Sequence, residues 1–549
     1  MQKLIFFLLY LISLQANTII HNATIYTVNE NQPHAQALVI KDEKIVYIGD
    51  DKKALSFKTI HSKTIDAQKA FIMPGIVDSH THTALAALLF NTGVNLYKAK
   101  GKKGILNALR TYKKANPDLD LYTGVGFYPY AFGPNGPTKE ELDKVFPDTK
   151  AFFMSNNAHQ AWANTKAMKF LNISKNTPDP LPEVHYYVRD KKGEPTGFLI
   201  EGEAFWPHLK TLGIGRKKDF KNALEKFLPS LSSIGITTIY DAAIPAIEEF
   251  AYEAIGELEK EDKLRLRYMA SHFILSTEDA EQASSKLLEL QKNYNTELFQ
   301  VSSIKFINDN SDDDNFGIQF KQDRLSQYLT PIFQANQDIM IHATQDDSIH
   351  QALNAIESAK KKAPTTQSRI TLAHVNMVRD EDFKRFKDLG VIANIQPFDA
   401  QGGGYYEYRY MLYDKKWENK LARYKHFFDE GIIVSSSSDY PACNKPLKEC
   451  SAFHGFQIGM TRQKINAINN EEILDSKDER LSLSQSIQAY TINGAYQLHL
   501  EDKVGSLEVG KEADLIILDK NPFKIDVKGI HTIKVIRTIF KGKTIYEQD

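Results

Sequence analysis

The chain has 549 residues, more than a single hydrophobic core usually spans, so we expect one large domain with smaller appendages. Its formal charge is −1, from 68 Lys and Arg against 69 Asp and Glu, and the basic residues are scattered rather than massed. This balance gives no reason to expect a nucleic-acid partner. The apolar content of 42% and charged content of 25% are those of an ordinary globular protein.

Residues 1–16 have the layout of a signal peptide, because Lys3 precedes an apolar run over residues 4–14 and the small Ala16 follows. The run is too short to span a bilayer. A core element of the mature fold and a retained anchor are the alternatives. With cleavage near Ala16, we expect an exported protein, periplasmic or secreted, that keeps no stable membrane association.

The only two cysteines, Cys443 and Cys450, would then meet an oxidising compartment. We expect them to form a disulfide, and two unrelated buried thiols are the alternative.

Residues 17–70 read as short strands separated by turn signals, and residues 505–549 repeat the same pattern at the other end of the chain. We therefore expect the two termini to build one small β-sandwich domain.

Between the termini, short apolar runs alternate with helical segments that have a charged face. There are eight such runs, at residues 71–80, 233–242, 264–273, 302–309, 338–344, 369–375, 391–397 and 432–439. Eight buried strands separated by helices predict a parallel (β/α)8 barrel of the α/β class, formed by residues 71–90 and 228–504. The long interval after the first strand predicts an inserted subdomain over residues 91–227.

Residue types that bind metals stand at the ends of several of these runs. In the first, Asp78, His80 and His82 alternate and so share one face of a strand. Barrel active sites lie at the C-terminal ends of strands, where later runs place Lys305, His342, His374 and Asp439. The structural alternatives are surface or satisfied core histidines, a snorkelling lysine and an N-capping aspartate. The joint arrangement favours a metal site.

The order of these residues resembles the amidohydrolase superfamily of metal-dependent hydrolases. Further phrases resemble its YtcJ-like branch, amidohydrolase family 3, which includes N-substituted formamide deformylase. They are PGIVDSHTH, ELDKVFPDTKAFF, NNAHQAWANTKAM, GEPTGFLIEGEA, SIKFINDNS, LGVIANIQP, SSSSDYP, QAYTINGAYQL and VGSLEVGKEADLIILD. The resemblance covers nearly the whole mature chain.

The resemblance implies two divalent metal ions, with zinc expected. By similarity, His80 and His82 bind the more buried ion, His342 and His374 bind the more exposed one, and a CO2-derived carbamate on Lys305 bridges both. Asp439 would bind metal and serve as general acid and base. A metal-activated hydroxide would then hydrolyse a non-peptide, amide-type C–N bond in a small molecule.

The inserted region supplies candidate substrate contacts. The branch suggests that His159 points into the active site, although it could instead cap a loop, and Glu201 is a second candidate. Trp162 is expected to pack in the core. The chain departs from the branch at Ala373-His374, at HATQD (342–346) and at Asp309-Asn310, so a known substrate cannot be carried over.

Two other functions stay open: a mononuclear hydrolase or deaminase on the same barrel, and a non-catalytic exported binding protein. Gln345 stands where deaminases of the superfamily typically carry Glu, which counts against a deaminase. The presence of all six ligand positions counts against a binding protein. The aromatic stretch at residues 401–417 could line the substrate pocket or pack the barrel mouth, and a homodimer is a further expectation.

Overall fold

The structure is a computed structural model that describes residues 17–548 apart from 92, 157–158, 181, 183–184, 215, 245–246, 309–321, 403–419, 444, 468–472 and 475–476. The predicted signal segment, the Asp309-Asn310 position and most of the aromatic stretch at 401–417 lie outside the described residues. None of the described helices combines the length and the apolar character needed to cross a bilayer.

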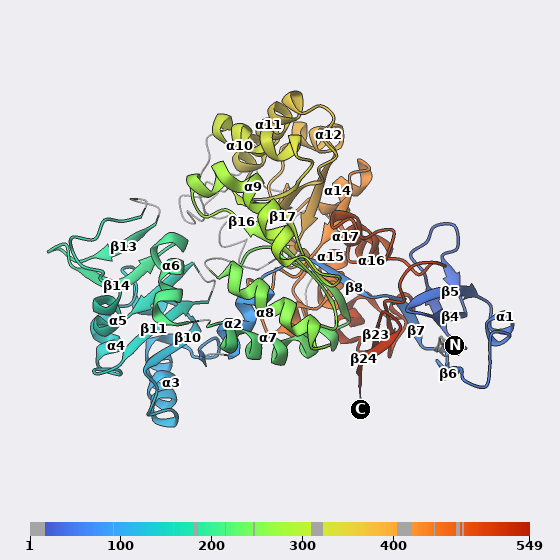
Figure 1. Ribbon diagram of the computed structural model, residues 1–549, viewed down its shortest axis with the longest axis horizontal. Helices are drawn as coiled ribbons and strands as arrows, with labels where there is room; N and C mark the ends of the chain where they lie inside the picture. The colour runs from blue at the N-terminus through green and yellow to red at the C-terminus, as the bar shows by residue number, and fades with distance from the viewer. Residues whose placement is uncertain are drawn as a thin grey trace, which may run out of the picture.

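The centre of the molecule is the predicted (β/α)8 barrel (Figure 1). Its eight parallel strands follow one another in chain order: β8 (Ile76–Thr81), β15 (Ile236–Asp241), β16 (Arg267–Phe273), β17 (Phe299–Ile307), β18 (Asp338–Ala343), β19 (Ile370–His374), β20 (Val391–Ile395) and β21 (Val434–Ser436). Most of their residues are buried, because helices cover the outside of the barrel and side chains fill its interior. This is why the strands appear in the sequence as short continuous apolar runs.

The helices around the barrel are amphipathic. They include α2 (Thr83–Asn91), α7 (Lys217–Ser232), α8 (Glu248–Lys260), α9 (Thr277–Tyr294), α10 (Gln322–Gln334), α11 (Asp346–Lys362), α12 (Asp380–Leu389), α14 (Tyr424–Asp429), α15 (Ala452–Thr461), α16 (Leu483–Ala489) and α17 (Ile492–Gln497). In α9, Ser276 and Asp279 form a capping box, and Ala280, Ala283 and Leu287 are buried at helical spacing. Local sequence therefore sets both the start of this helix and the face that packs.

The run at residues 71–80 is two strands rather than one, which corrects the predicted start of the barrel. β7 (Phe71–Pro74) pairs with β2 and β22 of a terminal sheet, and only β8 belongs to the barrel. Gly75 lies between them, and a Cβ there would approach the Thr237 side chain within 2.4 Å. A residue without a side chain is therefore required where the chain passes from one sheet to the other.

Strands from the two termini form the terminal sheets. One has the order β5-β4-β1-β6, made of β5 (Lys44–Gly49), β4 (Ala37–Lys41), β1 (Thr18–His21) and β6 (Lys63–Asp66). The other has the order β24-β23-β22-β7-β2-β3, made of β24 (Lys543–Glu547), β23 (Val535–Phe540), β22 (Leu515–Leu518), β7, β2 (Thr24–Tyr26) and β3 (His34–Ala35). Residues of both termini share one apolar cluster, which includes Ile20, Leu38, Leu515 and Ile539.

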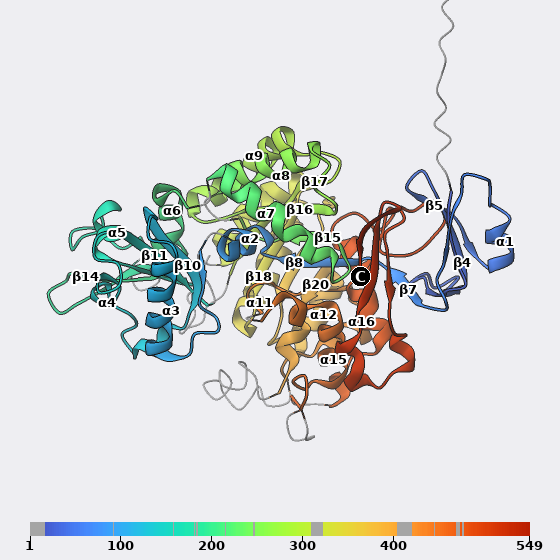
Figure 2. The same cartoon turned by 90° about the horizontal axis from the view of Figure 1, so that it is seen from below.

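The segment after α2 builds a separate six-stranded sheet at the end of the molecule opposite the N-terminal strands (Figures 1 and 2). Its strands are β9 (Val94–Asn95), β10 (Leu121–Phe127), β11 (Lys150–Ser155), β12 (Gln160–Ala163), β13 (Tyr186–Arg189) and β14 (Pro195–Ile200), and its helices are α3 (Gly101–Ala115), α4 (Lys139–Asp143), α5 (Thr165–Phe170) and α6 (Gly202–Leu212). Trp162 is fully buried in this region, and its indole N–H donates to the Thr138 carbonyl at 2.8 Å. It therefore packs, as the sequence suggested.

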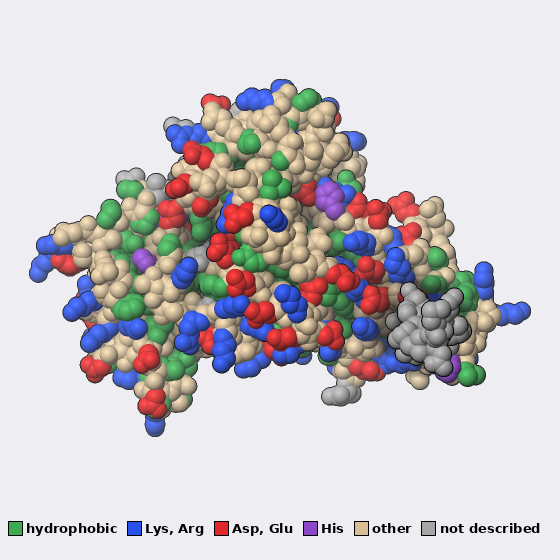
Figure 3. All heavy atoms as spheres, in the orientation of Figure 1, with side chains coloured by type: hydrophobic (Ala, Val, Ile, Leu, Met, Phe, Trp, Pro, Cys, Tyr) green, Lys and Arg blue, Asp and Glu red, His purple; other side chains and the backbone are tan. Residues whose placement is uncertain are grey.

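Positive and negative side chains are interspersed over the face of the molecule drawn in Figure 3. The scattered charges of the sequence thus produce no stripe of one sign on that face.

A buried ion-pair cluster joins the barrel to the C-terminal segment. Arg267 of β16 pairs with Asp514 and Glu512, and its guanidinium lies 4.8 Å from the centre of the Phe540 ring. Arg267 and Asp514 are 4% and 2% exposed. Burial raises the pKa of Asp514, and Arg267 opposes that effect.

Replacing Arg267 with Met should lower the free energy of unfolding by roughly 3–5 kcal/mol, because it leaves the Asp514 carboxylate buried without its cation. The double variant Arg267→Met/Asp514→Asn should recover part of the loss. Denaturant midpoints measure both. The exposed pair Arg216–Asp219 offers the control, since Arg216→Ala should cost less than about 1 kcal/mol. Equal stabilities of the single and double variants would contradict this account.

Candidate metal centre

All six predicted ligands line one cavity at the C-terminal end of the barrel. His80 lies in β8 and His82 directly follows it, Lys305 lies in β17, His342 in β18 and His374 at the end of β19, and Asp439 follows β21. The cavity volume is about 100 Å³. Its other described lining residues are Leu85, Tyr97, Asn156, His159, Trp206, Ala243, Phe273, Ile307, Pro441 and Ala442.

Asp439 lies between the two histidines of the first strand. Its Oδ1 is 3.5 Å from Nε2 of His80 and 3.3 Å from Nε2 of His82. One donor atom from each of these three residues lies within 4.8 Å of the others, a spacing that one metal ion can bridge.

The remaining histidines continue this group. The His80 and His374 ring centres are 5.1 Å apart, and those of His374 and His342 are 4.1 Å apart. Four imidazole rings from three strands therefore surround one end of the cavity.

The electrostatics of the site favour the metal-binding form of each group. His80 is 1% exposed, and burial, followed by the nearby Lys305, holds its pKa well below the usual value, so the imidazole is neutral. Burial alone would raise the pKa of Asp439, but His82 and His374 outweigh it and keep that pKa below its usual value. A neutral imidazole and an ionised carboxylate are the forms that bind a divalent cation.

The residues present also fit such an ion by their chemistry. Imidazole nitrogens and a carboxylate are the donor set that zinc prefers. Oδ1 of Asp439, the atom that faces both histidines, is buried and accepts no hydrogen bond from the described residues. Such a group is costly in a protein interior unless a ligand or ion engages the side chain.

Two of the candidate ligands have a left-handed backbone conformation. His374 has φ 77°, the following Val375 has φ 43°, and Asp439 has φ 52°. A residue other than glycine in this region costs of order 1–3 kcal/mol, and such strain persists mainly at functional sites. The Asp439 N–H donates to the His80 carbonyl at 3.0 Å, which fixes Asp439 against the first strand.

Two buried carboxyl groups that are not among the six predicted ligands lie behind the site. Asp78 accepts the Ser438 N–H at 2.9 Å, and burial raises its pKa to about 7. Asp241, at the end of β15, accepts the Ala84 N–H at 2.7 Å, and burial raises its pKa to about 6. A sequence signal for Asp241 was present, because it ends a predicted barrel strand.

The inserted sheet contributes His159 to the lining of the cavity. Nδ1 of His159 lies 3.3 Å from the Glu201 carboxylate, and the Glu201 N–H donates to the His159 carbonyl at 2.8 Å. Glu201 is 3% exposed, has φ 64° and is not among the described residues that line the cavity. The structure therefore places His159 in the cavity wall and Glu201 behind it, where it contacts His159.

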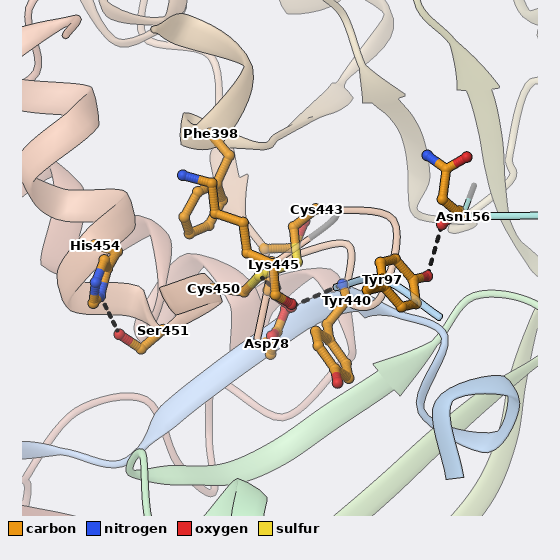
Figure 4. Close-up of a disulfide and its surroundings, with 12 residues drawn as sticks. Asp78, Tyr97, Asn156, Phe398, Tyr440, Cys443, Lys445, Cys450, Ser451 and His454 are labelled. Atoms are coloured by element: carbon orange, nitrogen blue, oxygen red, sulfur yellow. Dashed lines mark hydrogen bonds between the residues drawn. A yellow bond between two sulfur atoms is a disulfide. The ribbon is translucent and has the colours of Figure 1, made fainter. Parts of the chain in front are cut away.

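Cys443 and Cys450 form a disulfide, with their Cα atoms 6.5 Å apart (Figure 4). The bond closes the segment that leaves Asp439, and Pro441 and Ala442 of that segment line the cavity. The same close-up shows Tyr97, whose hydroxyl donates to the Asn156 carbonyl at 2.7 Å. Tyr97 and Asn156 line the cavity as well, and no sequence pattern indicated that Tyr97 would lie there.

A parallel (β/α)8 barrel with histidines, lysine and aspartate at its strand ends defines the class of amidohydrolase-type hydrolases. The chain belongs to the amidohydrolase family, whose profile matches residues 63–546.

Among its curated relatives is N-substituted formamide deformylase of Arthrobacter pascens, 23% identical over 96% of this chain and 98% of that protein. Putative amidohydrolase YtcJ of Bacillus subtilis (strain 168) is 24% identical over 96% of this chain and 99% of that protein. An uncharacterized metal-dependent hydrolase from Pyrococcus horikoshii OT3 has the same fold, with a TM-score of 0.72, 21% identity and coverage of 93% of this chain and 99% of that one.

The disulfide between Cys443 and Cys450, which closes a short loop, can be tested by thiol titration. Titration of the unfolded, unreduced protein should find no free thiol. In the loop-entropy model, closing this short loop contributes about 2.5 kcal/mol, which is small beside the barrel core. Reduction should therefore lower the activity more than it lowers the melting temperature, because the loosened segment carries cavity residues. Two free thiols, or equal effects on activity and melting, would contradict this prediction.

Proposed function

We propose that this protein hydrolyses a non-peptide, amide-type C–N bond in a small molecule. The observation that carries the proposal is the group of His80, His82 and Asp439 at the end of a cavity that Lys305, His342 and His374 also line. The family includes a relative named for the deformylation of N-substituted formamides and another named as an amidohydrolase, and both align with nearly the whole chain.

The described residues would hold two divalent ions, for which we propose zinc. His80, His82 and Asp439 would bind one ion, His342 and His374 the other, and a carbamate on Lys305 would bridge them. Lys305 is 1% exposed and lies beside the histidines, where its amine could capture CO2 to form the carbamate. When bound, such ions polarise a carbonyl group and lower the pKa of water.

Asp439 would carry the proton during the reaction. Its carboxylate is ionised because the surrounding histidines hold its pKa low, and its side chain is 18% exposed toward the cavity. It would accept a proton from the attacking water and deliver it to the leaving nitrogen. The hydrogen bond from its own N–H to His80 keeps the carboxylate in place through both transfers.

His159, which the inserted region contributes to the cavity wall, would orient the substrate. Glu201 fixes one nitrogen of the imidazole, so the ring keeps one orientation and presents its other edge to the cavity. This pair would hold a polar atom of the substrate while the amide carbon faces Asp439.

A hydrolase with one ion is the second candidate. It is favoured by one observation: among the described residues, the metal-ligand group consists of His80, His82 and Asp439. The metal content per protein molecule separates the two candidates, because two ions support the first and one ion supports the second.

We also propose that the protein is exported, as residues 1–16 predict. The disulfide between its only two cysteines supports this proposal, because such bonds persist in oxidising compartments. N-terminal sequencing of the mature protein should begin near residue 17, and an intact N-terminus on protein recovered from the cytoplasm would contradict export.

The purified protein should release amine from members of a panel of amides and ureas, and Asp439→Asn should lower kcat by at least about 100-fold. The substitution keeps the size of the side chain, so folding and much of the metal content should persist. Steady-state kinetics with metal analysis tests both statements. Asp219→Asn, in an exposed ion pair, is the control that should leave kcat unchanged. Near-normal turnover by Asp439→Asn would remove that carboxylate from the mechanism.

Replacing Lys305 with Ala should abolish activity and reduce the metal content, because it removes the proposed bridging carbamate. Short carboxylic acids should restore part of the activity by taking the place of the carbamate. Lys286→Ala, which removes a lysine of a partly exposed ion pair, should change neither property. The carbamate proposal fails if a metal-loaded crystal structure shows Lys305 unmodified and distant from the ions.

A further inference from the structure

The wall of the cavity is divided into a ligand side and an apolar side. Ala243, Phe273 and Ile307 form a hydrophobic cluster of their own, separate from the barrel core, and all three line the cavity. Phe273 and Ile307 are the last residues of β16 and β17, and Ala243 lies two residues after the end of the neighbouring strand β15. The candidate ligands other than Lys305 come from the remaining part of the ring, on β8, β18 and β19 and after β21.

β17 carries both kinds of residue in a fixed order. Lys305 and Ile307 are two positions apart, so their side chains lie on the same face of the strand. Because the strand runs toward the barrel mouth, Ile307 lies one step farther out than Lys305. A substrate whose reacting bond is near Lys305 therefore extends past the apolar cluster.

The inserted region and its neighbours add further apolar surface to the cavity. Trp206 is 4% exposed and Leu85 is 9% exposed, and both line the cavity. Trp206 packs closely on its own helix, since a Cβ on Gly202 would approach the indole within 2.8 Å. The indole thus lies against its own helix and forms an apolar part of the wall.

Apart from the ligand group, the described lining residues offer little charge. Tyr97 and His159 are the only other ionisable ones. Burial raises the pKa of Tyr97, so its hydroxyl stays neutral, and His159 is already paired with Glu201. A charged substituent placed against this part of the wall would lose its hydration without gaining a counter-charge from the lining residues that the structure describes.

We infer that the substrate is an uncharged amide with one compact apolar group, of the size of an aromatic ring or a branched alkyl chain, that lies against Ala243, Phe273 and Ile307. This inference rests on the proposed function and narrows its substrate class. Amides that carry a carboxylate or ammonium on that group should bind weakly and be hydrolysed slowly.

Binding of hydroxamic acids to the metal-loaded protein tests the inference without turnover, because the hydroxamate group binds divalent ions and leaves its substituent to contact the wall. Calorimetry should show that benzohydroxamate binds at least about tenfold more tightly than acetohydroxamate. A carboxylate in the para position should remove at least about tenfold of that affinity. Equal or tighter binding of the carboxylated compound, or no binding of any of the three, would overturn the inference.

Variants test whether the preference for an apolar substituent comes from Phe273 and Ile307. Phe273→Ala should reduce the ratio of benzohydroxamate to acetohydroxamate affinity by at least about fivefold, and Phe273→Leu should reduce it less. Phe170→Ala is the matched control, since Phe170 is a 47% exposed aromatic residue outside the cavity lining. An unchanged ratio in Phe273→Leu and Ile307→Ala would overturn the placement even if Phe273→Ala fails to fold.

Turnover of matched amides separates failure of this inference from failure of the proposed function. Hydrolysis of para-carboxylated amides as fast as their uncharged counterparts would overturn the inference and leave the proposed function standing. The expected order of hydroxamate affinities, with no amide or urea in the series hydrolysed, would support the apolar wall and overturn the proposed function.

Discussion

The closure of the barrel between β8 and β21 is the constraint on which the site depends. These two strands end the hydrogen-bonded order of the sheet, and individual hydrogen bonds connect them instead of a regular ladder. The contacts are Asp439 N–H to His80 O, His82 N–H to Tyr440 O, Ser79 hydroxyl to Ser436 O and Ser438 N–H to the Asp78 carboxylate. We call this junction between β8 and β21 the seam. Because His80 and His82 lie on one side of the seam and Asp439 on the other, the seam sets the distances between their donor atoms.

A buried polar network supports the seam from inside the barrel. The Asn394 amide donates to the Ser79 and Ser435 hydroxyls at 2.9 and 3.0 Å, and Gln497 of α17 donates to the Ser79 carbonyl at 2.9 Å. Buried polar groups of this kind are costly unless they are satisfied, so the network tolerates few alternative arrangements. Through this hydrogen bond, α17 contacts β8, the strand that carries His80.

The barrel alone provides only part of the cavity. Its strand ends supply the ligand group and the apolar cluster around Phe273, whereas the inserted region supplies His159 and Trp206. The segment after Asp439, closed by the disulfide, adds Pro441 and Ala442. The candidate ligand group thus lies on a single sheet, whereas the rest of the cavity wall comes partly from barrel strand ends and partly from elements joined to the barrel.

The barrel could be predicted from the sequence, as could the strand-end positions of His80, His82, Lys305, His342, His374 and Asp439, because alternation along a strand and the common edge of parallel strands follow simple rules. It also indicated the pairing of the two cysteines through their number and the export signal. The folded structure was needed to show that residues 71–80 divide between two sheets and that Glu201 lies behind His159. The same holds for the meeting of Trp206 with Phe273 at one cavity, because residues far apart in the chain come together through packing that no local pattern records.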